Sequence, residues 1–261
     1  MFGTVIIDAY KQTETREIAD ALEELCAPTD SYGWASAGIY CYWDYYTRET
    51  LYIGLASDLA VRFKQHNGIL PLKSGSKQKR IEEYFAIHDG GKLGFSIFVQ
   101  SPLAQPLVSR NRSTYGSFAK QYGAPVVDLL SDQGINDIKR VEGILIEAYR
   151  QATGHFPLWN RVGGSITGQK RVMTRNINIV KAFSHPEFVS ISPITSRSSL
   201  RELSDNPTYE RYESFLHGAR QLIFSLGMEY DRAIDFVARS DILGTIDEMR
   251  ENGYLEKQLS V

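Results

Sequence analysis

Few cysteines, no long apolar run and no basic leader are present in this sequence. Its 261 residues include only Cys26 and Cys41, which are too few for a disulfide framework and suit a reducing compartment. The absence of a CxxC pair or a histidine cluster argues against a structural zinc site. No apolar stretch approaches the length of a membrane span, and residues 1–9 carry Asp8 instead of a basic leader. We therefore expect a soluble, cytoplasmic protein without a membrane partner.

An excess of positive charge is also missing. The formal net charge is −2, so any attraction for nucleic acid must come from a local basic patch. Hydrophobic residues make up 43% of the chain, which is ample for the core of one large domain or of two modest ones. The sequence contains no internal repeat and no low-complexity tract.

Two short runs rich in β-branched and aromatic residues follow the first helical stretch. Residues 37–43 and 50–54 flank a turn-like segment, and this arrangement predicts an antiparallel hairpin. Side chains two apart share one face of a strand, so we expect Tyr40 and Tyr42 to point together. A further alternating run at 93–99 predicts a third strand of the same sheet.

A helix is predicted directly after the hairpin. Ser57 offers a side-chain oxygen at its start, and Asn67 followed by Gly68 marks its end. Arg62 and His66 are four residues apart, so a cation and an imidazole lie on one stripe of this helix.

Another predicted helix, at about 136–150, carries an acid where an apolar residue is expected. Its apolar stripe consists of Ile138, Val141, Leu145 and Tyr149. Glu142 lies on that stripe, where an ionised carboxylate is costly unless it is paired or binds a cation. Glu147 is expected on the solvated face of the helix. The pattern therefore favours Glu142 as the functional carboxylate.

Together these residues resemble the motifs of the GIY-YIG nuclease family. Gly38-Ile39-Tyr40 and Tyr52-Ile53-Gly54 stand in the family's order with an eleven-residue spacer. Arg62 and His66 follow with the Arg-x-x-x-His spacing of its restriction and homing endonucleases. The last matching motif is Pro157-Leu158-Trp159-Asn160. It lies further from Glu142 than in the family, because 151–156 looks like an insertion. The resemblance covers about 36–160 and is closest to the restriction enzymes.

What the resemblance implies for the fold is an α+β arrangement. It predicts a small three-stranded antiparallel sheet flanked by helices, with insertions and a helical C-terminal part. We expect an N-terminal arm and helix at 1–35, a nuclease domain at 36–164 with an insertion around 101–133, a basic linker at 165–206 and a helical region at 207–261. Acids outnumber bases in the last region, so we expect it to serve assembly rather than DNA contact.

For the chemistry, the resemblance implies phosphodiester hydrolysis with defined roles. Tyr40 is expected to activate the attacking water and Tyr52 to assist, while Arg62 binds the phosphate. A phenol near pKa 10 is a poor base at neutral pH, and His66 is placed to accept a tyrosine's proton.

The resemblance also implies which residues bind a metal ion and which contact DNA. Glu142 is expected to bind one Mg²⁺ or Mn²⁺ completed by water and phosphate oxygens, and Asn160 to hold sheet and helix together or to contact a phosphate. Basic residues expected to contact double-stranded DNA are Lys73, Lys77, Lys79, Arg80, Arg110, Arg112, Lys170 and Arg171.

These observations predict a metal-dependent DNA endonuclease of restriction or other defence type. It is expected to act as a homodimer, at least on DNA, because a single site cuts one strand. Two alternatives remain: a repair or homing nuclease, and a non-cleaving nucleic-acid-binding module on the same fold. The acidic tail does not look like the basic modules expected of a homing enzyme.

Overall fold

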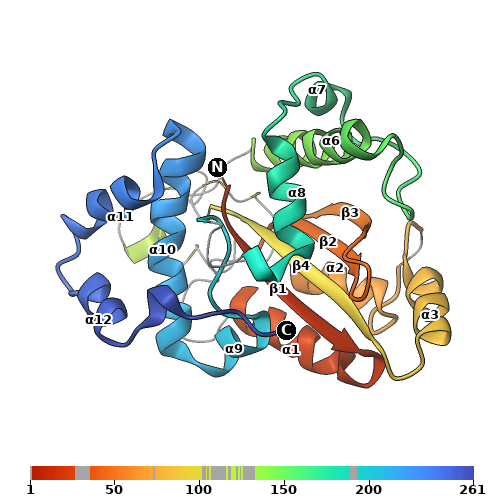
Figure 1. Cartoon of the computed structure of the whole chain (residues 1–261), viewed down its shortest axis with the longest axis horizontal. Coiled ribbons are helices and arrows are strands. Elements are labelled where there is room, and N and C mark those ends of the chain that lie inside the picture. Colours follow the sequence, from red (N-terminus) through yellow and green to blue (C-terminus); the bar gives the residue numbers. More distant parts are fainter. Residues whose placement is uncertain are drawn as a thin grey trace.

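A four-stranded antiparallel sheet with helices on both faces forms the centre of the computed structural model (Figure 1). The structure describes residues 2–26, 36–72, 74–101, 133–188 and 193–261, with a few positions between 104 and 125. The α+β class is therefore confirmed, whereas the prediction of a three-stranded sheet was wrong. None of the described helices is both long and apolar enough to cross a membrane.

The additional strand comes from the start of the chain. The strands are β1 (Phe2–Lys11), β2 (Gly38–Asp44), β3 (Thr50–Ala56) and β4 (Lys92–Gln100), in the spatial order β1-β4-β2-β3. β1 was expected to be a short strand or an arm, but it pairs with β4 and is buried from Phe2 to Tyr10. Both faces of β1 are covered, so its local sequence lacks the alternation of a half-buried strand.

Both edges of the sheet are occupied by irregular chain. Beside β1, the Val5 N–H donates to the Ile194 carbonyl at 2.8 Å and the Ser196 N–H donates to the Val5 carbonyl at 2.7 Å. Beside β3, the Trp159 N–H donates to the Leu51 carbonyl at 2.8 Å. Neither edge is therefore left bare for pairing with another chain at these positions.

One face of the sheet is covered by four helices. These are α1 (Thr15–Cys26), α2 (Leu59–His66), α3 (Gln78–Ile87) and α9 (Leu200–Asp205). They share one apolar cluster with the sheet, in which Phe63 packs edge-on against Phe95, with ring centroids 4.8 Å apart. Tyr40 and Tyr42 belong to this face, as their spacing predicts.

The opposite face is covered mainly by α6 (Gly134–Thr153) and α8 (Asn176–Ser184), which appear at the top of Figure 1. Trp43, Phe98 and Phe183 are central to this second cluster. α6 confirms the helix predicted at 136–150. It also reaches β3, the strand that carries Tyr52.

Helices occur in the described parts of 165–206, although this range was expected to be a basic linker. α7 (Ile166–Gln169) packs on α6, α8 packs on the sheet, and α9 packs on α1. Arg201 anchors α9 through an ion pair of 2.8 Å to Asp8, which is buried in β1. Lys181 and Arg201 are thus carried by packed helices, so basic charge in this range did not indicate an unstructured chain.

The C-terminal helices are α10 (Pro207–Leu226), α11 (Tyr230–Ala238) and α12 (Thr245–Glu251), as predicted. They enclose a third apolar cluster that includes Leu216, Ile234 and Met249. α10 also packs along β1, and Phe224 lies 5.2 Å from the ring of Phe98. The remaining described helical turns are η1 (Gln12–Glu14), η3 (Pro186–Phe188) and η4 (Tyr254–Glu256).

Most of the expected insertion at 101–133 lies outside the described residues, as do 27–35. Lys73, Arg110 and Arg112, three residues predicted to contact DNA, also lie outside them.

Candidate active site

The hairpin places two tyrosines over its second strand. Tyr40 in β2 is opposite Gly54 in β3, and Tyr42 is opposite Tyr52. A Cβ atom on Gly54 would lie 2.6 Å from Cζ and Oη of Tyr40. Gly54 therefore makes the room that the Tyr40 phenol needs to lie across β3. The rings of Tyr40 and Tyr52 are 5.7 Å apart.

α2 brings the predicted arginine and histidine to these tyrosines. The helix begins after Asp58, whose carboxylate accepts the Val61 N–H at 2.9 Å, so the N-cap is Asp58 and not Ser57. His66, in the last turn, is buried, and its Nε2 lies 2.6 Å from Oη of Tyr40.

The hydrogen bonds of His66 determine its tautomer. The backbone N–H of Lys77 donates to Nδ1 of His66 at 3.1 Å, so Nδ1 must keep a lone pair. Burial, with further contributions from Arg62 and Lys77, lowers the pKa of His66 to about 3, so the ring is neutral. A neutral imidazole with an unprotonated Nδ1 carries its proton on Nε2. His66 therefore donates to Tyr40, the reverse of the predicted role as acceptor of the tyrosine proton.

Glu142 of α6 is an unpaired carboxylate. Within the part of the chain that the structure describes, no hydrogen bond or ion pair forms to its side chain, and burial raises its pKa to about 7. A Cβ atom on Gly164, which has a φ of +69°, would lie 3.2 Å from Oε2 of Glu142. The carboxylate thus lies against the chain that follows Asn160, and no described residue compensates its charge.

Glu147 was expected on the solvated face, but it is only 7% exposed. Arg150 donates to its two oxygens at 2.8 and 2.7 Å, and Gln151 donates at 2.9 Å. The hydrogen bonds from Arg150 and Gln151 lower the pKa of Glu147 to about 2. These partners cover the carboxylate, an effect that the periodicity of the helix does not reveal. Glu147 is a satisfied structural acid, which leaves Glu142 as the functional candidate.

Asn160 is committed to the sheet. The Ile53 N–H donates to its Oδ1 at 2.9 Å, and its Nδ2 donates to the Ile53 carbonyl at 2.8 Å. Both ends of the amide are thereby used to attach the Asn160 segment to β3. This is the first of its two predicted roles, that of holding the geometry.

We call Tyr40, Tyr52, Arg62, His66 and Glu142 the tyrosine centre. Burial raises the pKa of Tyr40, the neighbouring hydroxyls of Tyr52 and Tyr42 raise it further, and Arg62 lowers it. Burial also raises the pKa of Tyr52. The hydrogen bond with the Tyr40 hydroxyl lowers this pKa, the charge of Glu142 raises it, and the charge of Arg62 lowers it. The five side chains thus form one electrostatic unit, although they come from different elements.

Arg62 supplies the positive charge of this unit. No acid pairs with its guanidinium among the described residues, in contrast to Lys64, which is 2.7 Å from Glu23 on the same helix. An arginine without a counter-ion next to a group of tyrosines is well suited to receive an anionic substrate group.

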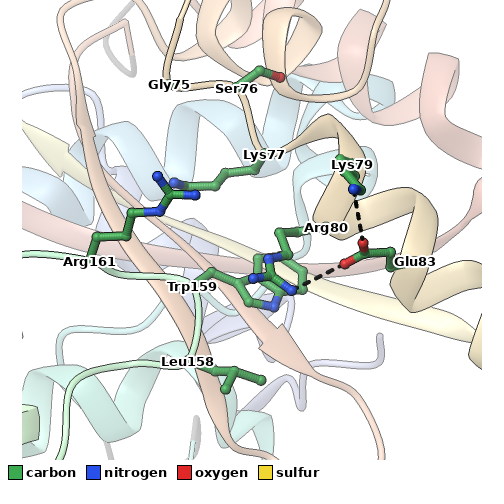
Figure 2. A pocket seen from close by; sticks show the side chains of 9 residues that line it. All are labelled: Gly75, Ser76, Lys77, Lys79, Arg80, Glu83, Leu158, Trp159 and Arg161. Carbon is green, nitrogen blue, oxygen red and sulfur yellow. Dashed lines mark hydrogen bonds and ion pairs between the residues drawn. The ribbon is translucent and has the colours of Figure 1, made fainter.

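A cationic cleft of about 480 Å³ lies beside the tyrosine centre (Figure 2). Lys77, Lys79 and Arg80, three predicted DNA contacts, line it together with Arg161. Lys77 connects the cleft to the centre, because its Nζ lies 4.5 Å from the centroid of the Tyr52 ring.

Sequence analysis did not identify Arg161 or Gly164 as site residues. Arg161 directly follows the Asn160 motif, and that adjacency was the available signal. Lys170 and Arg171 are exposed at the end of α7 and are not among the residues lining the cleft.

Glu142 fits a divalent cation only as a single protein ligand. No group of three or more His, Cys, Asp or Glu side chains suited to a metal occurs among the described residues. Mg²⁺ commonly keeps several waters and takes one or two carboxylates together with substrate phosphates. One unpaired carboxylate is compatible with Mg²⁺ or Mn²⁺ held in that manner.

Comparison of the chain with models of protein families, with curated proteins and with solved structures yields no match. The assignment of an activity therefore rests on the residues of the tyrosine centre and its surroundings.

Proposed function

We propose that the protein is a metal-dependent DNA endonuclease of the GIY-YIG type, which hydrolyses phosphodiester bonds. The observation that carries this proposal is that Glu142 and Arg62, each without a counter-ion among the described residues, both act on Tyr52, which lies beside the hydrogen-bonded Tyr40 and His66. Unpaired charges on partly buried side chains cost stability, so their presence in one place supports a site that binds charged groups.

In this proposal Arg62 binds oxygens of the scissile phosphate and stabilises the charge of the pentavalent transition state. Tyr40 orients the attacking water and takes its proton. Before it can do so, Tyr40 must release its own phenolic proton to solvent water, because His66 is already protonated on Nε2, and burial opposes this release. The Nε2–H of His66 and the charge of Arg62 both favour the phenolate and so oppose the effect of burial.

Glu142 would hold a Mg²⁺ or Mn²⁺ ion, which supplies positive charge next to the phosphate oxygens. The raised pKa of Glu142 means that protons compete with the metal near neutral pH. Both Glu142 and Tyr40 affect the pKa of Tyr52, and the rings of Tyr52 and Tyr40 are neighbours. We assign Tyr52 the role of fixing the position of the Tyr40 hydroxyl.

A restriction or defence role is the class that we propose, with double-stranded DNA as substrate and a homodimer as the cutting species. One tyrosine centre cuts one strand, so two centres are needed for a double-strand break in one encounter. Light scattering with and without a DNA duplex tests the dimer.

The experiment that tests the activity is cleavage of a supercoiled plasmid with Mg²⁺ or Mn²⁺, on methylated and unmethylated DNA, with the ends mapped by sequencing. We expect nicked or linear products only when a divalent ion is present. Methylation that blocks cleavage would support the defence role. Intact plasmid under all these conditions would contradict the proposed activity.

A further inference from the structure

The residues that line the cleft beside the tyrosine centre carry more positive than negative charge. Four cationic side chains and one acid, Glu83, line it. Glu83 is shared between Arg80 at 3.2 Å and Lys79 at 3.9 Å. Lys77 and Arg161 have no acidic partner among the described residues.

Lys77 and Arg161 converge on the same space, although they come from opposite walls of the cleft. Lys77 precedes α3, and Arg161 follows the segment that Asn160 attaches to β3. Figure 2 shows the two side chains extending toward each other across the opening. Burial lowers the pKa of Lys77, and the charges of Arg161 and Arg80 lower it further, as expected for cations held close together.

The start of α3 adds backbone donors to this charge. Lys77 is its N-cap and provides no side-chain cap, and only the first N–H, that of Gln78, is met by the Ser76 hydroxyl at 3.0 Å. Ser76, Lys77, Lys79 and Arg80 all line the cleft, so the positive end of the helix opens into it. A helix N-terminus beside two unpaired cations favours an anion with several oxygens.

We propose that this cleft is a phosphate-binding subsite, in which Lys77, Arg161 and the N-terminus of α3 hold a phosphate of the cleaved strand next to the scissile one. The proposal rests on the proposed nuclease activity and specifies where the strand runs. Lys77 connects the cleft directly to the tyrosine centre, because its backbone N–H donates to His66 and its side chain lies over the Tyr52 ring. The cleft is also large enough for a phosphate together with part of its sugar.

The test compares Arg161→Gln with Arg239→Gln. Arg239 is an exposed arginine at the end of α11, so the control removes the same charge far from the cleft in sequence and in fold. Binding of a DNA duplex to Glu142→Gln protein, which prevents turnover, is measured as a function of salt concentration. We expect Arg161→Gln to weaken binding about three- to tenfold and to reduce the slope of log Kd against log salt by about 1. The control should leave both unchanged.

Single methylphosphonate substitutions then locate the phosphate. Neutralising one phosphate next to the scissile position should weaken binding of the parent protein more than it weakens Arg161→Gln, because one of the partners of that phosphate is already lost in the variant. Equal losses at every position in both proteins would overturn the subsite. So would an Arg161→Gln variant that behaves like Arg239→Gln.

A second arm separates this proposal from the nuclease activity. Binding of inorganic pyrophosphate in the absence of metal is followed by tryptophan fluorescence, since Trp159 lines the cleft. Binding that is lost in Arg161→Gln and Lys77→Met supports the anion site even if the protein neither binds nor cuts DNA, and the phosphate then comes from another ligand. Failure to bind pyrophosphate, together with unaltered DNA binding in both variants, would overturn the subsite even if the plasmid is cut.

Discussion

Two clusters of polar side chains in this molecule differ in whether their charges are paired. In the tyrosine centre, Glu142 and Arg62 lack counter-ions among the described residues. In the second cluster, which we call the arginine clamp, Glu213 and Arg220 of α10 form an ion pair of 2.5 Å and are almost completely buried.

Every charged atom of the arginine clamp has a partner. Arg220 also donates to the carbonyls of Pro193 and Thr195, each at 3.0 Å, and to the Thr4 hydroxyl at 3.2 Å. Glu213 accepts the Tyr254 hydroxyl at 2.9 Å. These bonds attach the C-terminal helices to β1. The comparison indicates that charges with protein partners stabilise this fold, whereas charges without a described partner are available to a ligand.

The comparison is tested most strongly by Glu213→Gln. It leaves the Arg220 guanidinium buried without its counter-ion, so we expect a loss of about 3–5 kcal/mol in the free energy of unfolding. Glu248→Gln breaks the exposed pair with Arg211, 2.7 Å long, and should cost much less, because an exposed ion pair adds little to stability. Urea unfolding measures both. Cleavage per folded molecule should be unaffected by Glu213→Gln, and equal small losses from the two substitutions would contradict the clamp.

Arg62→Ala and Tyr40→Phe should act on catalysis instead. Both groups stabilise charge that develops in the transition state, so we expect a drop of about a hundred- to a thousandfold in the single-turnover rate. DNA affinity should change much less. Lys64→Ala is the control on α2, because Lys64 is paired with Glu23. A variant that lost DNA binding but kept its rate would be reassigned to substrate positioning.

Glu142→Gln should stabilise the metal-free protein in a pH-dependent way. Burial raises the pKa of Glu142 from 4.5 to about 7, so the folded state holds an extra proton between these values and loses stability as pH rises through them. The variant has no such loss. Relative to the parent, its free energy of unfolding should be higher by up to about 3 kcal/mol above pH 7 and unchanged below pH 4.5. Glu147, whose pKa is lowered to about 2, has the opposite sign, and Glu147→Gln should destabilise at neutral pH. Unfolding in EDTA at pH 4.5 and 8 checks both, and a gain from Glu142→Gln that did not depend on pH would contradict the assignment.

A smaller effect distinguishes the donor role of His66 from a role as base. A glutamine can place an N–H near Nε2 of His66 and keep a hydrogen bond to Tyr40. We therefore expect His66→Gln to retain a single-turnover rate within about tenfold of the parent, since one net hydrogen bond is at stake. His66→Ala should lose about a hundredfold. Equal, severe losses in both variants would favour His66 as a proton acceptor.

Local patterns predicted much of the fold around the site. Runs of β-branched and aromatic residues around a turn predicted β2 and β3, and alternation predicted β4. Start and stop residues predicted α2, the apolar stripe predicted α6, and helices were also expected near α1 and from α10 to α12. The pairing of β1 with β4 was missed because strand pairing is set by distant residues, and β1 is covered on both faces. The basic residues and glycines of 165–206 suggested a linker, although Gly164 in fact permits the chain to pass close to Glu142.

The site was less predictable than the fold, and the reasons lie in tertiary contacts. Spacing identified the residues of the tyrosine centre, but the tautomer of His66 depends on the Lys77 N–H. The burial of Glu147 depends on Arg150 and Gln151. Phe224 of the tail packs on Phe98 of β4, a contact that no local pattern in the tail indicates.

The most direct test of the central claim is the metal dependence of DNA cleavage by the parent protein, Glu142→Gln and Glu147→Gln. Single-turnover rates are measured over a Mg²⁺ titration at pH 8, where Glu142 is ionised. We predict that the parent cleaves with saturable metal dependence, that Glu147→Gln behaves like the parent, and that Glu142→Gln shows no metal-supported cleavage while remaining folded. Parent-like cleavage by Glu142→Gln, or its loss in Glu147→Gln alone, would contradict the claim that the unpaired carboxylate is the functional one.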